Sequence, residues 1–228
     1  MAFLGVGIKQ IEPELVNLAG NGEFIVKSFR DNTFYNPGEH HCEQSRGCLR
    51  MPKRALFVGR FQPFHYGHLH AIEAILKEAD ELLIVVGSAQ MSHEPDNPFT
   101  AGERLEMIIY ALDAAGIDRD LYMLIPIPDA PAHRVWVSQV ESQAPRFDIV
   151  YTNQPLTRRL LVEAGYEVKG IKLHERDRYE ASEIRHRILK DEDWRDLVPP
   201  EVYEFIKAIG GEDRIQDLAK SDTVNSRR

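Results

Sequence analysis

Hydrophobic positions in residues 53–219 alternate between short apolar runs and stretches where apolar residues recur every three or four positions. Short runs closed by glycine or proline are typical of buried strands, and the longer spacing is typical of helices with one buried face. The pattern predicts strands over 54–58, 82–86, 121–127, 147–152 and 166–173. Helices are predicted after the first strand (Leu69, Ile72, Ile75, Leu76 and Ala79 on one face), over 100–115, 135–141 and 156–164, and through most of 182–219, with breaks at Pro199-Pro200 and Gly210-Gly211.

This order of elements defines the fold class that we expect. Strands alternating with crossover helices indicate a Rossmann-like α/β fold, in which a parallel sheet carries helices on both faces and a C-terminal helical segment follows. Ligands of such folds bind beyond the carboxyl ends of the strands. We therefore expect functional residues directly after each strand.

Residues 1–50 follow neither pattern. Asn, Gly and Pro recur among short apolar pieces such as Phe24-Ile25-Val26, so we expect a weakly ordered extension with room for one hairpin. Because Met51 directly precedes the first strong strand, one hypothesis is that it is the functional start and that residues 1–50 are not native; mass spectrometry of protein made from the natural gene tests this. We divide the chain into this extension, a domain over residues 51–220 and a flexible polar tail over 221–228.

Composition narrows the class of function. The chain has 228 residues, 43% of them hydrophobic, and a formal net charge of -8, which argues against a general nucleic-acid binder because phosphate backbones require a basic face. A nucleotide substrate remains compatible with this charge. No apolar run is long enough to span a bilayer and the N-terminus does not resemble a signal peptide, so we expect a cytoplasmic protein that binds no membrane.

The two cysteines of the chain are the first candidates for a metal site. Cys42 and Cys48 lie close to His40 and His41, which places four possible soft-metal ligands together. Their spacing is wider than that of common zinc sites. We therefore interpret this stretch as a polar segment and expect no protein-built metal site.

The end of the first strand carries the clearest candidate chemistry. His65 and His68 are three residues apart at the start of a helix, so their rings share one side, and Gly67 would let a ligand approach the backbone. Free amides in a first helical turn favour anions, and Arg60 adds a permanent positive charge. Taken alone, two histidines at this spacing more often merely cap a helix. In this strand-to-helix context they predict a polyphosphate site.

The longer string Gly59-Arg60-Phe61-Gln62-Pro63-Phe64-His65-Tyr66-Gly67-His68 resembles the signature of archaeal-type nicotinamide-nucleotide adenylyltransferases, within the His-x-Gly-His nucleotidyltransferase superfamily. Further resemblances are Gly87-Ser88-Ala89-Gln90, Asn97-Pro98-Phe99-Thr100-Ala101-Gly102-Glu103-Arg104 and Asp193-Trp194-Arg195. The resemblance covers residues 53–219 and identifies the domain over 51–220 as a nucleotidyltransferase domain. It implies catalytic roles for His65, His68, Arg60 and Arg185, and substrate contacts from Gly59, Phe61, Gly67, Gly87, Ser88, Arg104, Asp129, Trp136, Asn153 and Ser182.

Each of the outlying residues also has an ordinary structural explanation. The resemblance implies that Arg104 contacts nucleotide phosphate, whereas a surface ion pair with Glu103 or a neighbour is an equal alternative. Asp129 and Trp136 follow the third strand, where the family receives the nicotinamide end; the alternatives are an Asx turn and core packing. His133 stands where the family commonly has Asn, so the details of ring recognition differ.

Tyr179-Glu180-Ala181-Ser182-Glu183-Ile184-Arg185 occupies the place of the superfamily's second signature. By resemblance, Ser182 caps a helix whose amides face phosphate, and Arg185 neutralises the triphosphate. Glu180 replaces the usual Ser. Asn153 lies where the family places an adenosine pocket, although its surrounding sequence departs from the family pattern. The basic residues Lys172, Arg176 and Arg178 are expected to be mainly solvated.

The resemblance implies transfer of AMP from ATP to nicotinamide mononucleotide, giving NAD and pyrophosphate, with Mg²⁺ held mainly by the ATP phosphates. Alternative acceptors are nicotinate mononucleotide, phosphopantetheine and FMN.

A non-catalytic nucleotide sensor is the alternative from another functional class. A class I aminoacyl-tRNA synthetase is excluded by length and by the lack of its second signature. Members of the family are often homo-oligomers, so we expect one here.

Overall fold

A computed structural model of the chain describes residues 15–16, 25–27, 34–35, 51–171 and 179–220, and it divides into a unit over residues 1–51 and a unit over residues 52–228. In the first unit, strands β1 (Leu15–Val16), β2 (Ile25–Lys27) and β3 (Phe34–Tyr35) form an antiparallel sheet in the order β1-β2-β3. The sequence suggested a single hairpin, whereas two successive hairpins are present. The histidines and cysteines of residues 40–48 lie outside the described residues.

The described part of the second unit is built on a five-stranded sheet in the order β6-β5-β4-β7-β8, with every neighbouring pair parallel. Its strands are β4 (Arg54–Gly59), β5 (Glu81–Val86), β6 (Tyr122–Pro126), β7 (Ile149–Tyr151) and β8 (Glu167–Lys169). The chain moves outward from β4 to β6 and then crosses to β7 on the other side of β4. The point where the strand order reverses therefore lies between β4 and β7, which is where open α/β sheets bind ligands.

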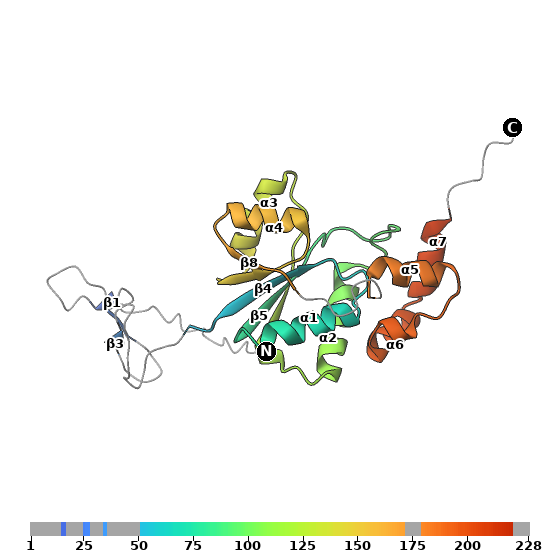
Figure 1. The fold of residues 1–228 in the computed structure, drawn as a ribbon, viewed down its shortest axis with the longest axis horizontal. Helices are drawn as coiled ribbons and strands as arrows, with labels where there is room; N and C mark the ends of the chain where they lie inside the picture. The colour runs from blue at the N-terminus through green and yellow to red at the C-terminus, as the bar shows by residue number, and fades with distance from the viewer. Residues whose placement is uncertain (1–14, 17–24, 28–33, 36–50, 172–178, 221–228) are drawn as a thin grey trace, which may run out of the picture. The chain divides into compact units, whose positions relative to one another are not determined.

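Helices cover both faces of this sheet (Figure 1). They are α1 (Tyr66–Leu76), α2 (Ala101–Ala114), α3 (His133–Gln143), α4 (Pro155–Glu163), α5 (Ala181–Leu189), α6 (Pro200–Ala208) and α7 (Gly211–Ala219). One core joins the sheet to α1, α2 and the C-terminal helices, and a second joins it to α3 and α4. Successive strand residues alternate between the two cores: Leu56 lies in the second and Phe57 in the first. The predicted fold class is confirmed.

The boundaries of six elements differ clearly from the prediction. Strand β6 is shorter than predicted because residues 119–121 form a 3-10 helix, and β7 and β8 each have three residues. Helix α3 begins at His133 and ends at Gln143, longer than predicted at both ends. Helix α5 ends at Leu189, well before the break that we predicted at Pro199-Pro200. Pro200 is the first residue of α6, a position where proline is favoured.

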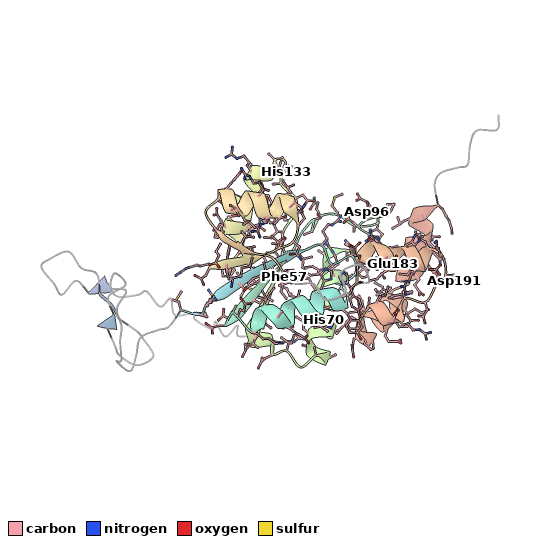
Figure 2. The ribbon with its side chains drawn as sticks, in the orientation of Figure 1. Phe57, His70, Asp96, His133, Glu183 and Asp191 are labelled. Atoms are coloured by element: carbon pink, nitrogen blue, oxygen red, sulfur yellow. The ribbon has the colours of Figure 1, made fainter. Side chains whose placement is uncertain are left out.

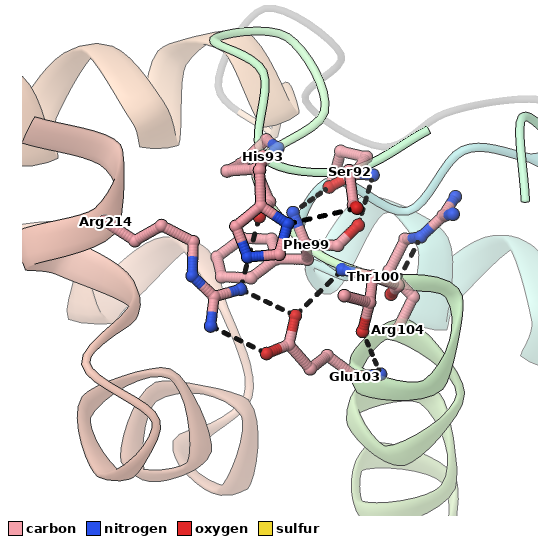
Figure 3. Close-up of polar contacts among 9 residues, drawn as sticks. Ser92, His93, Phe99, Thr100, Glu103, Arg104 and Arg214 are labelled. Carbon is pink, nitrogen blue, oxygen red and sulfur yellow. Dashed lines mark hydrogen bonds and ion pairs between the residues drawn. The ribbon is translucent and has the colours of Figure 1, made fainter. Parts of the chain in front are cut away.

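The start of α2 connects the sheet to the C-terminal helices. The predicted capping box is present: the Thr100 amide donates to a Glu103 carboxylate oxygen at 2.8 Å and the Glu103 amide donates to Thr100 Oγ1 at 3.2 Å. Arg214 of α7 donates two hydrogen bonds to the same carboxylate, at 2.7 and 2.8 Å (Figure 3). One glutamate therefore caps α2 and attaches α7 to it.

Candidate active site

The loop between β4 and α1 brings the two predicted histidines into direct contact. The His65 and His68 rings stack with centroids 3.6 Å apart and planes 27° from parallel. Burial lowers the pKa of His65 from 6.5 to about 3. Burial is also the main cause that lowers the pKa of His68, and electrostatic repulsion from His65 lowers it further. Both rings are therefore neutral at physiological pH. The Nδ1 atoms of both are buried and, within the described part of the chain, make no hydrogen bond.

The backbone of this loop is shaped to support the histidine pair. Phe61 has a φ of 53° and is 1% exposed, and its ring centroid lies 4.7 Å from that of His68. A Cβ on Gly59 would lie 2.7 Å from the Phe61 ring, so only glycine leaves room there. A Cβ on Gly67 would lie 3.0 Å from the His65 ring. A Cβ there would also lie 3.1 Å from Tyr179 Cβ, so packing within the protein by itself favours glycine at this position.

Gln62 is a structural residue of the site that our sequence analysis missed. Its buried side chain exchanges two hydrogen bonds with the Phe99 backbone, at 2.9 and 3.0 Å, which attaches this loop to the segment before α2. The backbone carbonyl oxygen of Gln62 accepts a 2.8 Å hydrogen bond from Arg185 of α5. Gln62 belongs to the first signature string, and this was the available signal.

Arg185 of α5 lines the same cavity as the histidines and is held from two sides. Besides the bond to Gln62, its guanidinium donates to Asp96 at 3.0 Å, and Asp96 lies in the loop that passes beside α5 (Figure 2). Burial lowers the pKa of Arg185, and the charge of Asp96 opposes that shift. Because an arginine stays protonated under these conditions, the site keeps a fixed cation at this wall.

These residues line a first cavity of about 340 Å³ at the carboxyl edge of the sheet. Of the residues predicted from the sequence, it is lined by Arg60, Phe61, His65, Gly67, His68, Asn153, Ser182 and Arg185. Ser182 lies in the first turn of α5 but does not cap it, because the helix already begins at Ala181 and has no side-chain capping bond; its hydroxyl instead donates a 3.3 Å hydrogen bond to Glu180. Lys172, Arg176 and Arg178 lie outside the described residues. A triphosphate in this cavity would face two arginines and a neutral histidine pair.

Asn153 has a structural role in the wall of this cavity. Its amide nitrogen donates to the Ile171 carbonyl at 2.8 Å, and its amide oxygen accepts from the Ile171 backbone N–H at 2.8 Å. This reciprocal pair joins the end of β7 to the segment after β8. With respect to the described residues, these bonds use one of the two N–H groups of the amide, so the other is available to a ligand.

Arg104 occupies a position that the sequence did not reveal. The residue is 0% exposed, and its guanidinium donates to four backbone carbonyls, at 3.2 Å to Thr100, 2.9 Å to Arg60, 2.8 Å to Gly87 and 3.1 Å to Ser88. Burial lowers its pKa to about 10. The surface ion pair that we considered is wrong, because Arg104 is buried and Glu103 pairs with Arg214. Four of its five N–H groups are in use, so Arg104 ties the ends of β4 and β5 together.

A second cavity, of about 540 Å³, lies on the α3 side of the same edge. The predicted residues that line it are Gly59, Arg60, Gly87, Ser88, Asp129 and Trp136, and His133 lines it too. Ser88 and Gln90 donate to the two oxygens of Asp129 at 3.0 and 3.1 Å, and the Asp129 amide donates back to Gln90 at 2.9 Å. Gln90 was missing from our predicted site residues, although its motif was recognised.

The two cavities meet at three residues. Val58, Arg60 and Gln154 line both of them. The position after β4 is therefore where molecules held in the two cavities would approach each other. Gln154 was not among the predicted site residues, although it follows Asn153 in the segment after β7 where the family places an adenosine pocket.

Two further features of the described residues bear on the function. None of their histidine, cysteine and carboxylate side chains gather in groups of three or more that could hold a metal ion. None of their helices is long and apolar enough to cross a membrane.

A family model described as cytidylyltransferase-like matches residues 56–187. A nicotinamide-nucleotide adenylyltransferase of Methanolobus tindarius is 49% identical over 170 residues, which cover 75% of this chain and 96% of the relative. One of Thermococcus onnurineus is 50% identical over 169 residues, covering 74% of this chain and 90% of the relative.

A solved structure with the same fold comes from Francisella tularensis. It is a bifunctional NMN adenylyltransferase/ADP ribose pyrophosphatase complexed with AMP and a manganese ion, with a TM-score of 0.64 and 25% identity. The match covers 74% of this chain and 52% of that protein, so this chain spans about half its length. The identity to curated relatives over nearly their full length confirms what the motifs implied: this chain belongs to the nicotinamide-nucleotide adenylyltransferase family.

Proposed function

We propose that this protein transfers the AMP moiety of ATP to nicotinamide mononucleotide, giving NAD and pyrophosphate. The observation that carries the proposal is the pair of cavities that meet at Arg60, one lined by the histidine pair and the other by Asp129 and Trp136. Such a site can hold a triphosphate and a second nucleotide with their reacting ends adjacent. The names of the relatives support the same reaction.

The reaction needs no protein nucleophile, because the 5′-phosphate of the mononucleotide can attack the α-phosphorus of ATP. The new bond joins the two phosphates, the bond to the β-phosphate breaks, and pyrophosphate leaves in line. Catalysis then consists of holding both substrates and stabilising charge on the phosphoryl oxygens. We assign His65 and His68 to the triphosphate as neutral N–H donors, with His68 nearest the α-phosphate. Arg60 and Arg185 hold the leaving pyrophosphate.

A divalent cation fits this cavity as a companion of the nucleotide. The donors present on the α5 wall are hard oxygens, the Glu180 carboxylate and the Ser182 hydroxyl, which suit Mg²⁺ or Mn²⁺. When bound, the cation offsets negative charge on the phosphate oxygens. We propose Mg²⁺ held mainly by the ATP phosphates, since the described residues provide no group of three ligands.

The second cavity favours the amide mononucleotide over its acid. Asp129 is exposed at the cavity wall, and each of its oxygens already accepts one bond while retaining a second lone pair. A carboxamide N–H can donate to such an oxygen, whereas a nicotinate carboxylate would be repelled by it. Trp136 adds a flat face for a cationic aromatic ring.

The test is an assay of purified protein with ATP and Mg²⁺ against four acceptors in parallel: nicotinamide mononucleotide, nicotinate mononucleotide, phosphopantetheine and FMN. We expect NAD and pyrophosphate with the first and the highest kcat/KM for it. His68→Ala should lose most of the rate with an unchanged fold. His186→Ala is the matched control, because His186 is exposed on α5 outside the lining of the cavity. Nucleotide binding without turnover on any acceptor would refute the proposal and favour a sensor.

A further inference from the structure

Glu180 places a carboxylate on the wall of a cavity that is otherwise built for anions. It is exposed at the N-terminal end of α5 and lines the same cavity as His65, His68 and Arg185. As the residue that precedes the first turn, it could cap the helix, yet its side chain accepts no capping hydrogen bond from α5. Among the described residues, its carboxylate accepts a 3.3 Å hydrogen bond from the Ser182 hydroxyl. The backbone amides of α5 therefore do not use this carboxylate.

The cavity is nevertheless prepared to receive a polar ligand. His65 is only 6% exposed, lines the cavity, and has a buried Nδ1 with no hydrogen-bond partner among the described residues. A buried polar atom without a partner is costly, so a ligand that pairs with the ring would relieve that cost. The first turn of α5 adds backbone amides that favour an anion.

Charge, however, does not favour a bare triphosphate. The histidines are neutral because burial lowers the pKa of each. Among the described residues, the cations that line the cavity are Arg60 and Arg185; Asp96 forms an ion pair with Arg185, and Glu180 adds a second carboxylate. The two positive charges are thus offset by two negative ones. A metal-free triphosphate carries several negative charges and would find no net positive charge on these side chains.

We propose that Glu180 is a protein ligand for the divalent cation that accompanies ATP. One carboxylate combined with phosphate oxygens and water is the usual way in which proteins hold Mg²⁺ beside a nucleotide. This role accounts for an acidic residue at a position where the family pattern has serine. The inference rests on the proposed function only in requiring that the cavity binds ATP.

The proposal predicts that removing the Glu180 charge changes the affinities for the two forms of ATP in opposite directions. Titration calorimetry with ATP alone, which cannot react without an acceptor, gives Kd values in Mg²⁺ and in EDTA. For Glu180→Gln we expect metal-free ATP to bind about threefold to tenfold more tightly, because a repulsion is removed. MgATP should bind about tenfold more weakly, because a metal ligand is lost.

A second readout observes the metal itself. The electron paramagnetic resonance signal of free Mn²⁺ reports the Kd of Mn²⁺ for the protein–ATP complex, and this Kd should rise about tenfold in Glu180→Gln. Glu180→Ser, which restores the family pattern, should behave in the same way. Glu183→Gln is the matched control: it removes one negative charge from the same helical turn, where Glu183 pairs with Arg187 at 2.9 Å, and should change neither affinity.

The outcomes separate the metal role from other roles of Glu180. If both forms of ATP bind more weakly, or neither affinity changes, in both Glu180 variants, the proposal is overturned, because loss of a structural or ribose contact lowers both affinities together. NAD formation by the wild-type protein tests the reaction independently. Opposite shifts in a protein that makes no dinucleotide would leave the metal assignment standing and remove the proposed reaction.

Discussion

Acidification should destabilise this protein through His65, because the folded state keeps this ring neutral. The residue is 6% exposed, and burial lowers its pKa from 6.5 to about 3. The unfolded chain takes up a proton below pH 6.5, whereas the folded chain does not until about pH 3. The stability contributed by the neutral ring is therefore complete above pH 6.5 and is lost as the pH falls toward 3.

The size of this effect follows from the same two pKa values. Each unit of pH below 6.5 lowers the free energy of unfolding by about 1.4 kcal/mol until the folded pKa is reached. At pH 5 the loss from one histidine therefore amounts to about 2 kcal/mol. Total stabilities of domains are only about 5–15 kcal/mol, so a change of this size is readily measured.

The assay is urea unfolding at pH 7.5 and pH 5 for the wild-type protein and for His65→Gln. Carboxylates and the distant histidines contribute equally to the pH dependence of both proteins, so the difference between the two reports His65 together with its effect on the stacked His68. The variant should lose about 2 kcal/mol less than the wild type between the two pH values. His186→Gln, at an exposed position on α5, should lose as much as the wild type. Equal losses in wild type and His65→Gln would show that the buried ring accepts a proton in place, and would refute the reasoning.

Two further substitutions test the framework of the site. Arg104→Lys should lower the free energy of unfolding by about 2–4 kcal/mol in urea denaturation, because one ammonium group cannot reach four buried carbonyls on three segments. A stability equal to that of the wild type would show that the four bonds add nothing. Asp129→Asn should raise the KM for nicotinamide mononucleotide about tenfold and leave the KM for ATP unchanged, because Asp129 lines the second cavity and not the first. A rise in the KM for ATP alone would contradict this assignment.

Local signals in the sequence were sufficient for the fold class and for one half of the site. The capping box of Thr100 and Glu103 is made within four residues, so its geometry follows from spacing alone. The histidine pair is similar, since His65 and His68 are brought together by a single helical turn. Residues that follow a strand could be assigned to one edge of the sheet for the same reason, because parallel strands end at the same edge.

Contacts between distant segments could not be predicted in this way. Gln62 bonds to Phe99, and Arg185 bonds to the Gln62 carbonyl across 123 residues of sequence. A cation in the first turn of α2 was compatible with a surface position, because nothing nearby in the sequence shows that the ends of β4 and β5 lie against it. Arg104 is buried only because those strands present their carbonyls there.

By itself, the sequence determined the alternation of strands and helices, the edge at which the chemistry lies, and the residues of the two signatures. These depend on periodicity and on short spacings, which act within one or two turns of the chain. Only the tertiary structure decided that Arg60 stands between two cavities, that Arg104 supports the backbone beneath them, and that Asp96 and Glu180 offset the arginines. The physical reason is that burial and charge balance are properties of the space around a side chain, and here segments far apart in the sequence form that space.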